Sequence, residues 1–400
     1  MYDSKYWIKE GKKATKPRTK RTARKLNVAD FFCGCGGLSL GALIACSQTG
    51  RKLNVALAAD VWSDALDVYK ENFRTTLKNS AVLDLSATVL HPGSLELSKA
   101  GEELCSKIGE LDVIVAGPPC QGHSDLNNSS RRDDPRNLLY TIPVAFALRS
   151  TAKILLIENV PTVVHSSDGV VNSALSALEK KGFSVMELVA DAQNFGLPQT
   201  RKRHLLIASR VHSRQRMEEL FSQVRKRKKD VPLWPFISDL ESESEDARLI
   251  TVRSKVSAEN KSRIQYLFDS GSYELPNNLR PRCHSEKSHS YVSMYGRLYP
   301  DRPAQTITSG FGSMGQGRFV HPTQPRLITA HEAARIQGFP DYFNFSPVRK
   351  ITALREMIGN AVPPAITATL LSLLISDIDG QVNTVIKTGQ GNLDFEIAVS

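Results

Sequence analysis

Short apolar runs alternate with amphipathic stretches through the first half of the chain. Runs rich in Val, Ile, Leu and Ala predict buried strands, and they cover residues 26–32, 54–59, 112–116, 153–158, 183–190 and 204–209. Stretches with a helical pattern separate them, at 38–45, 63–72, 138–150 and 171–181. Because such alternation is typical of parallel βαβ units, the sequence predicts an α/β fold with a doubly wound, Rossmann-like sheet.

The alternation stops near residue 210, where the composition changes. The next stretch is charged and rich in Ser and Pro, which indicates a second, smaller, loop-rich domain. Helical signals then return at Thr329, which has the spacing of a capping box with Glu332. The predicted organisation is a first domain at 26–210, the loop-rich domain at 211–325, C-terminal helices at 326–376 and an unassigned tail at 377–400.

Positive charge is concentrated at the N-terminus. The formal charge of the chain is +11, and residues 1–25 contain ten Lys or Arg and two acidic residues. We expect this segment to be a disordered basic arm that attracts a polyanion by releasing counterions. A solubilising tail without further function is the alternative.

Hydropathy and cysteine spacing place the protein inside the cell. The apolar runs are shorter than the roughly 20 residues that span a bilayer, and no apolar stretch follows the basic N-terminus as in a secretory signal. The six cysteines lack the spacing of a disulfide framework, so we expect reduced thiols in the cytoplasm. Cys33 and Cys35 have neither C-x-x-C spacing nor a set of His partners, so they are expected to pack rather than to bind metal.

A glycine-rich turn follows the first predicted strand. Its glycines would let a nucleotide-like cofactor approach the backbone, although a purely structural turn is the alternative. The spacing is not G-x-G-x-x-G, and the chain has no G-x-x-x-x-G-K-[ST] phosphate loop, so an adenosine cofactor without phosphates fits better. Asp60, after the second predicted strand, is placed to accept hydrogen bonds from ribose hydroxyls, and Asp84 is a candidate for the adenine amine.

A second turn carries a cysteine on a stiff bend, Pro118-Pro119-Cys120. The carboxyl ends of the strands form the ligand crevice of an open α/β sheet, so Cys120 is a candidate nucleophile. Glu158 ends the next predicted strand at the same edge, and Arg201 and Arg203 precede the strand 204–209. A thiol, a carboxyl and two guanidiniums are therefore predicted to meet in one crevice.

These segments resemble, in type and order, the motifs of the cytosine-carbon-5 DNA methyltransferase family. The matching motifs are F-x-G-x-G-G at 32–37, P-P-C-Q at 118–121, E-N-V at 158–160, Q-x-R-x-R at 199–203, R-L and P-A-x-T-I at 297–307, A-R-I-Q-G-F-P at 334–340 and G-N-A-V-P-P at 359–364. Only 211–290 lacks a family pattern between residues 27 and 376. The sequence departs from the family at His123, where Phe is usual, and at Asp60, where Glu is usual and an aromatic residue follows directly.

The resemblance implies transfer of a methyl group from S-adenosylmethionine to carbon 5 of cytosine in DNA. Cys120 would add to carbon 6 of the flipped-out base, and Glu158 would hold nitrogen 3 and the exocyclic amine. Arg203 would contact the 2-keto oxygen while Arg201 supports the loop. The implied cofactor-binding residues are Phe32, Gly34, Gly36, Gly37, Asp60, Asp84, Leu85, Pro118, Asn360 and Val362. For Asn360, a helix cap is the alternative role.

The loop-rich domain is then expected to be a target-recognition domain for double-stranded DNA, with the C-terminal helices returning to the first domain. The basic clusters 225–229 and 280–282 are candidates for phosphate contacts, with solvated surface as the alternative. We expect a monomeric, nucleoid-associated enzyme that needs no metal and acts with companion restriction or defence proteins. An RNA methyltransferase with the same chemistry and a catalytically inactive DNA-binding homologue are the alternatives.

Overall fold

One seven-stranded sheet organises the part of the chain that the structure describes. The structure is a computed structural model, and it describes residues 3–17, 19–20, 22–74, 76–119, 135–165, 169–225, 230–282 and 294–378. The strands are β1 (Lys25–Phe31), β2 (Lys52–Asp60), β3 (Ser80–Val82), β4 (Val113–Ala116), β5 (Ile154–Asn159), β6 (Ser184–Asp191) and β7 (Lys202–Ser209). Their spatial order is β3-β2-β1-β4-β5-β7-β6, and β1 to β5 pair in parallel. Because the strand order reverses between β1 and β4, the predicted doubly wound sheet is confirmed.

Strand β7 runs antiparallel to both of its neighbours, so the prediction of parallel units is wrong for this strand. Its register pairs Glu158 with Leu205 and Val189 with His204. The connection from β6 to β7 covers residues 192–201, whereas a parallel crossover needs roughly a dozen residues or more. The chain therefore returns directly alongside β6.

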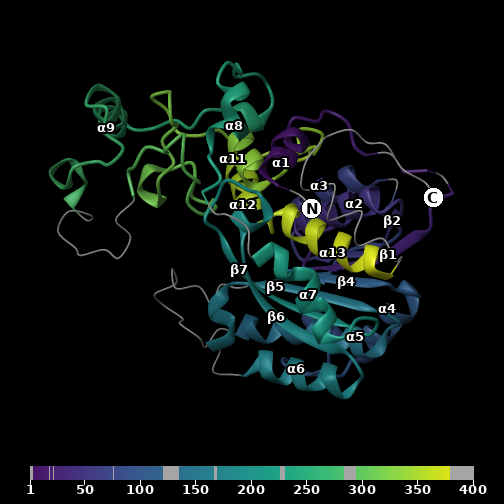
Figure 1. Cartoon of the computed structure of the whole chain (residues 1–400). Coiled ribbons are helices and arrows are strands. Elements are labelled where there is room, and N and C mark those ends of the chain that lie inside the picture. Colours follow the sequence, from purple (N-terminus) through teal and green to yellow (C-terminus); the bar gives the residue numbers. More distant parts are fainter. Residues whose placement is uncertain are drawn as a thin grey trace.

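Helices cover both faces of the sheet (Figure 1). One face packs against α2 (Gly37–Gln48), α3 (Ser63–Phe73), α7 (Arg214–Arg225) and α13 (Pro364–Ile378), and the other against α4 (Lys99–Ile108), α5 (Thr141–Arg149) and α6 (Val170–Lys180). Each face of the sheet has its own hydrophobic core, and successive residues of β1 point to opposite faces. Val28 lies in the first core, under α2 and α13, and Ala29 lies in the second core, under α4 to α6. A strand buried on both faces has to be apolar throughout, which is why these strands appear in the sequence as continuous apolar runs.

Helix α13 packs beside α2 and returns the C-terminal part of the chain to the sheet. A Cβ on Gly41 would lie 2.4 Å from the carbonyl oxygen of Pro364, so this close approach requires glycine. The run Ile351–Ile378, which comprises α12 (Ile351–Asn360) and α13, is long and apolar enough to cross a membrane. Of its apolar window, 94% is buried inside the protein, as in a core helix.

A loop-rich lobe, which we define as residues 230–282 and 294–325, extends away from the sheet. Its helices α8 (Trp234–Ile237) and α9 (Ala258–Asp269) are joined by coil and short turns, and α9 lies far from the sheet in Figure 1. Helix α7 was predicted to belong to this lobe. It instead packs on β6 and α13, where Arg216 forms an ion pair with Asp377 at 2.5 Å. The predicted domain boundary at residue 211 therefore falls before a helix that covers the sheet.

The prediction of a disordered N-terminal arm is wrong for residues 3–17. Helix α1 (Ser4–Gly11) begins after Asp3, whose side chain accepts a backbone hydrogen bond at 2.9 Å from the first turn. Trp7 on this helix is buried in a core that continues from the sheet into the loop-rich lobe, and α1 contacts α8 of that lobe. Composition predicted disorder because the segment is polar, but one large buried aromatic side chain supplies enough apolar area to dock a short helix.

Candidate active site

The carboxyl ends of β1, β4 and β5 lie side by side at one edge of the sheet. The turn after β1 contains Phe32 and Gly34, the turn after β4 contains Pro118, and β5 ends with Glu158 and Asn159. The side-chain amide of Asn159 donates a hydrogen bond to the Pro118 carbonyl oxygen at 3.4 Å. The parallel strands thus bring together turns that are distant in the sequence.

The predicted nucleophile Cys120 lies outside the described residues, as does His123. The described chain leads from β4 as far as Pro119, the residue before the cysteine. Cys120 as the nucleophile therefore stays a prediction that rests on its motif and on the position of the turn before it.

Glu158 and Arg203 form an ion pair at this edge. The Arg203 Nε lies 2.8 Å from the Glu158 Oε1, and the two side chains are only 16% and 9% exposed. Strand β7 pairs Leu205 with Glu158, so Arg203, two residues before Leu205, lies on the same face of the sheet as Glu158. The antiparallel direction of β7 thus brings the guanidinium to the carboxylate.

Arg201 was predicted to support the loop and Arg203 to contact the base, and the structure gives the two side chains different partners. Arg201 is buried, and its Nη1 donates hydrogen bonds to the carbonyl oxygens of Ile307 at 3.0 Å and Gly359 at 3.1 Å. Arg201 therefore holds the lobe and the end of α12 against the start of β7. We describe it as a positioning residue.

Two buried glutamines next to this region were not predicted. The Gln199 Nε2 donates to the Gln337 Oε1 at 2.8 Å, and the Gln337 Nε2 donates to the Ile358 carbonyl oxygen at 2.6 Å. Both residues lie in motifs that the sequence shows, Q-x-R-x-R and A-R-I-Q-G-F-P. Membership of a motif was the available signal, whereas their pairing depends on the tertiary fold.

The glycine turn has a packed side and an open side. A Cβ on Gly36 would lie 2.6 Å from the Phe73 ring, and one on Gly37 would lie 2.4 Å from the Val362 carbonyl oxygen. A Cβ on Gly34 would meet nothing within 4 Å. Gly36 and Gly37 therefore allow close packing of the fold, while Gly34 leaves space for a ligand to approach the backbone.

Phe32 and Asp60 shape this turn. Phe32 has a φ of 56°, which is uncommon for a residue other than glycine and often marks a functional site. Asp60 accepts hydrogen bonds from the N–H groups of Gly34 at 2.8 Å and Trp62 at 2.9 Å. Since a carboxylate has about four acceptor positions, Asp60 can hold the turn and still accept from ribose hydroxyls.

Three predicted cofactor residues come from the other turns of this region. Val362 lies beside Gly117 after β4, its Cγ2 3.6 Å from where a Cβ of that glycine would be. Pro118 is buried, and Asn360 is exposed at the end of α12. Val362 thus brings the C-terminal G-N-A-V-P-P segment to both the first and the second turn of the crevice.

Asp84 and Leu85 lie in the turn after β3. The exposed Asp84 side chain accepts a hydrogen bond from the Ser86 N–H at 3.0 Å, while Leu85 is buried in the second core. In the described contacts, Asp84 therefore caps a short helical turn that Leu85 anchors.

Cys33 and Cys35 are buried in the glycine turn. Burial raises the pKa of both thiols, that of Cys35 to about 12, so both stay protonated at neutral pH. Among the residues that the structure describes, no group of three or more His, Cys, Asp or Glu side chains is placed to hold a metal ion.

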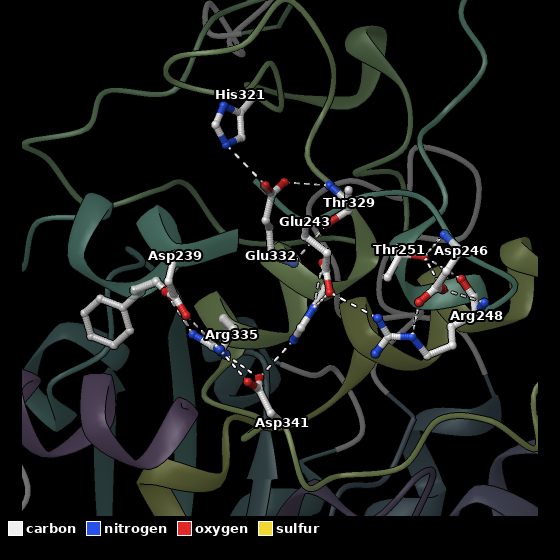
Figure 2. Close-up of polar contacts among 12 residues, drawn as sticks. Asp239, Glu243, Asp246, Arg248, Thr251, His321, Thr329, Glu332, Arg335 and Asp341 are labelled. Atoms are coloured by element: carbon white, nitrogen blue, oxygen red, sulfur yellow. Dashed lines mark hydrogen bonds and ion pairs between the residues drawn. The ribbon is translucent and has the colours of Figure 1, made fainter. Parts of the chain in front are cut away.

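A polar network surrounds α11 (Ala330–Gln337), where the loop-rich lobe meets the sheet domain (Figure 2). The predicted capping box is confirmed: the Thr329 hydroxyl accepts from the Glu332 N–H, and the Glu332 carboxylate accepts from the Thr329 N–H. Arg326 donates two further hydrogen bonds to Glu332, at 2.7 and 2.8 Å. Burial by itself would raise the pKa of Glu332, but the hydrogen bonds from Arg326 and His321 outweigh it and hold the pKa at about 2.

His331, also on α11, lies between two acids. Its Nδ1 is 2.9 Å from Glu243, and its Nε2 is 2.9 Å from Asp341. Both nitrogens have to carry protons to donate these bonds, so the geometry is that of an imidazolium. Burial favours the neutral ring, yet the two carboxylates raise the pKa of His331. We call this network the α11 joint; it comprises Lys12, Asp239, Glu243, Asp246, Arg248, Thr251, His321, Arg326, Thr329, His331, Glu332, Arg335 and Asp341.

Comparison with known proteins agrees with this architecture. The model of the C-5 cytosine-specific DNA methylase family matches residues 26–375. Type II methyltransferase M1.BsuMI of Bacillus subtilis (strain 168) is 42% identical over 361 residues, which cover 89% of this chain and 82% of that protein. Type II methylase M.HgiDII of Herpetosiphon aurantiacus is 27% identical and covers 88% of this chain and 96% of its own.

The solved structure of S. pombe Dnmt2 methyltransferase aligns with a TM-score of 0.60 and 16% identity, and it covers 89% of this chain and 100% of its own. An identity this low supports the fold alone. The family match over most of the chain and the 42% identical relative carry the assignment. The chain therefore belongs to the C-5 cytosine-specific DNA methylase family, which confirms the resemblance that its motifs indicate.

Proposed function

We propose that the protein is a site-specific DNA methyltransferase that modifies carbon 5 of cytosine in a restriction-modification or host-defence system. Its family and the Type II names of its relatives support this. The observation that carries the chemistry is the Glu158–Arg203 ion pair, at the edge where the turn after β4 leads towards Cys120. We expect a monomer that acts on the DNA of the nucleoid in the cytoplasm, alongside companion restriction or defence proteins.

Cys120 supplies the proposed nucleophile. Its thiolate adds to carbon 6 of cytosine, which forms a sulfur–carbon bond and moves electron density to carbon 5. Glu158 gives its carboxyl proton to ring nitrogen 3 as the thiolate adds, accepts a hydrogen bond from the exocyclic amine, and takes the proton back after methyl transfer. Arg203 orients the Glu158 carboxyl group and donates to the 2-keto oxygen. After methyl transfer, the carbon 5 proton leaves to a base and the sulfur–carbon bond breaks, giving 5-methylcytosine and free Cys120.

S-adenosylmethionine is the proposed cofactor, and it supplies an electrophilic methyl group. The residues of the glycine turn fit such a ligand: Gly34 has an open side, Asp60 keeps acceptor capacity, and one oxygen of the buried Asp30 carboxylate has no hydrogen-bond partner among the described residues. A ligand with an adenosine and a positive centre matches these features. The other residues of the proposed set are Phe32, Gly36, Gly37, Asp84, Leu85, Pro118, Asn360 and Val362.

The loop-rich lobe is the proposed target-recognition domain for double-stranded DNA. Cys120 and a methyl donor cannot reach a stacked base from opposite faces, so the cytosine has to flip out, which costs a few kcal/mol. The lobe contains arginines stacked on tyrosines, with Arg302 4.4 Å from the Tyr299 ring and Arg297 4.8 Å from the Tyr273 ring. Such preorganised cations suit phosphate contacts.

The structure describes the two predicted basic clusters to different extents. Residues 226–229 of the first lie outside the described residues. In the second, Arg280 donates a hydrogen bond from its Nε to the Leu275 carbonyl oxygen at 3.2 Å, so part of its side chain already supports the lobe. Phosphate contacts by residues 280–282 remain a proposal.

Transfer of a labelled methyl group from S-adenosylmethionine to duplex DNA and to transfer RNA tests the proposed function. We expect label in DNA, none in RNA, and no transfer by Cys120→Ala although this variant still binds cofactor. DNA with 5-fluorocytosine at the target should trap a covalent adduct, because carbon 5 then has no proton to lose. As a matched control, Cys105→Ala on α4 should keep full activity. Label in RNA alone, or full activity of Cys120→Ala, would contradict the proposal.

The role of Glu158 has its own test. Glu158→Gln should slow methyl transfer by roughly 10²- to 10⁴-fold, the usual contribution of a group that handles a proton in the transition state. Because the change also removes the ion-pair partner of Arg203, the rates are compared at a temperature where denaturation curves show both proteins folded. Glu187→Gln on β6, another strand of the same sheet, is the matched control. Bisulfite sequencing of DNA from expressing cells would report the modified base and the target word together.

A further inference from the structure

Asp30 is a buried carboxylate among the apolar residues of β1, and it has no role in the proposed steps of methyl transfer. It lies near the carboxyl end of β1, paired with Ala58 of β2 and Val115 of β4, and it is 0% exposed. The glycine turn begins two residues later (Figure 1). Burying a carboxylate is costly unless it is paired or hydrogen-bonded, so its partners show what the position is for.

The two oxygens of Asp30 have different surroundings. The Ser39 hydroxyl donates to Oδ2 at 2.6 Å, and the Tyr69 hydroxyl lies 2.5 Å from the Ser39 oxygen. Because Ser39 has one hydroxyl proton and gives it to Asp30, Tyr69 has to be the donor to Ser39. The other oxygen of Asp30, Oδ1, is buried without a hydrogen-bond partner among the described residues.

Among the described residues, the groups that act on the pKa of Asp30 carry no positive charge. They are the Ser39 and Tyr69 hydroxyls, the Cys33 and Cys35 thiols, and the Asp60 carboxylate from the end of β2. Burial raises the pKa of both thiols and of Tyr69, so these three are neutral at physiological pH. The remaining group, Asp60, is another acid and raises the pKa of Asp30 further.

This arrangement leaves the charge of Asp30 easy to change. Burial raises its pKa to about 7, the Ser39 hydrogen bond opposes this, and Asp60 adds to it. A cation that arrives nearby favours the ionised form, whereas a neutral ligand does not. S-adenosylmethionine has a sulfonium, and the demethylated product S-adenosylhomocysteine has a neutral sulfur at the same position.

We propose that Asp30 is a charge-selecting residue of the glycine turn, which makes the cofactor site prefer a ligand with a positive centre over the neutral demethylated product. The proposal rests on S-adenosylmethionine as the cofactor. Asp30 lies beneath the turn, and its ionised carboxylate acts on the bound ligand through its electrostatic field. This field reaches the ligand because a charge in a buried environment is weakly screened.

Isothermal titration calorimetry without DNA tests this. The probes are sinefungin, an analogue with a charged amine in place of the sulfonium, and S-adenosylhomocysteine. From about pH 6 to about pH 8, as Asp30 ionises, the preference for sinefungin should grow by about tenfold, the size expected for one charge acting over several ångströms. At about pH 7, sinefungin should release about half a proton and S-adenosylhomocysteine clearly less, as read from the heats in two buffers of different ionisation enthalpy.

Asp30→Asn should remove both the growth of the preference and the difference in proton release. Ser39→Ala removes a hydrogen bond to the ionised form, so the rise in preference should move to higher pH; this variant keeps the test available if Asp30→Asn does not fold. Asp112→Asn is the matched control, because Asp112 lies next to β4 at the amino edge of the same sheet and is paired with Lys153. It should behave like the wild type.

The outcomes separate this inference from the proposed function. If both probes bind but their ratio is independent of pH, or is the same in Asp30→Asn as in the wild type, the charge-selecting role of Asp30 is wrong and the cofactor stands. If neither probe binds while the protein is folded, the proposed cofactor itself is wrong.

Discussion

Asp30, on β1 before the glycine turn, and Glu332 in the α11 joint are both buried carboxylates, yet their surroundings are opposite. Glu332 receives two hydrogen bonds from Arg326, and its pKa is about 2 although burial would raise it. Asp30 receives one hydrogen bond, from Ser39, and burial raises its pKa to about 7. A buried acid that the fold pairs with an arginine joins segments together, whereas one without a nearby cation has a raised pKa and a charge that its surroundings can change.

Removing the charge of Glu332 should have the largest effect on stability. In Glu332→Gln, Arg326 and His321 face a neutral amide in a buried place, which should lower the free energy of unfolding by about 3–5 kcal/mol. Urea denaturation at neutral pH measures this. Glu356→Gln, on the exposed side of α12, is the matched control and should change little. Equal effects of both variants would mean that the α11 joint does not hold the lobe.

Shortening Trp7 tests whether α1 belongs to the same joint. Lys12 of this N-terminal segment forms an ion pair with Asp239 at 3.0 Å, and Trp7 is buried. Trp7→Ala should therefore cost about 3 kcal/mol of unfolding free energy, the usual price of truncating a buried large aromatic. Lys9→Ala on the exposed side of α1 should cost almost nothing. A Trp7→Ala variant as stable as the wild type would show that the segment is a detached arm.

Asp30→Asn should stabilise the protein, in contrast to Glu332→Gln. The folded pKa of Asp30 is raised to about 7, so its contribution to stability is full below its unfolded pKa of about 4 and is lost as pH rises to about 7. The variant lacks this loss. Because each pH unit between these two pKa values is worth about 1.4 kcal/mol, the free energy of unfolding of the variant should gain about 2–3 kcal/mol on that of the wild type between about pH 5 and about pH 8. Chemical denaturation across this range measures the difference, and a variant less stable at about pH 8 would contradict it.

Replacing His331 should have the smallest effect on stability. Its folded pKa is raised by Asp341 and Glu243 against the effect of burial, so its stabilising contribution is full below the unfolded pKa of about 6.5 and is lost as pH rises through the folded value. Between about pH 6 and about pH 9, the free energy of unfolding of the wild type should fall by about 1 kcal/mol more than that of His331→Gln. Parallel pH slopes of the melting temperature in the two proteins would exclude an imidazolium in the α11 joint.

The sequence by itself determined the alternation of strands and helices, the doubly wound sheet and the edge at which the motifs gather. Burial on both faces requires continuous apolar strands, and motifs that follow such strands have to lie at their carboxyl ends. The capping box of Thr329 and Glu332 was also predictable, because its two residues are three positions apart and interact through one helical turn.

Only the tertiary structure decided the direction of β7, the docking of α1 and the separate partners of Arg201 and Arg203. It also decided that, among the residues the structure describes, Asp30 has acids and neutral groups around it while Glu332 meets Arg326 and His321. A local pattern records which side chains are apolar or charged. Which charges meet, and which remain without a partner, depends on distances between segments that are far apart in the chain, and these exist only once the fold has closed.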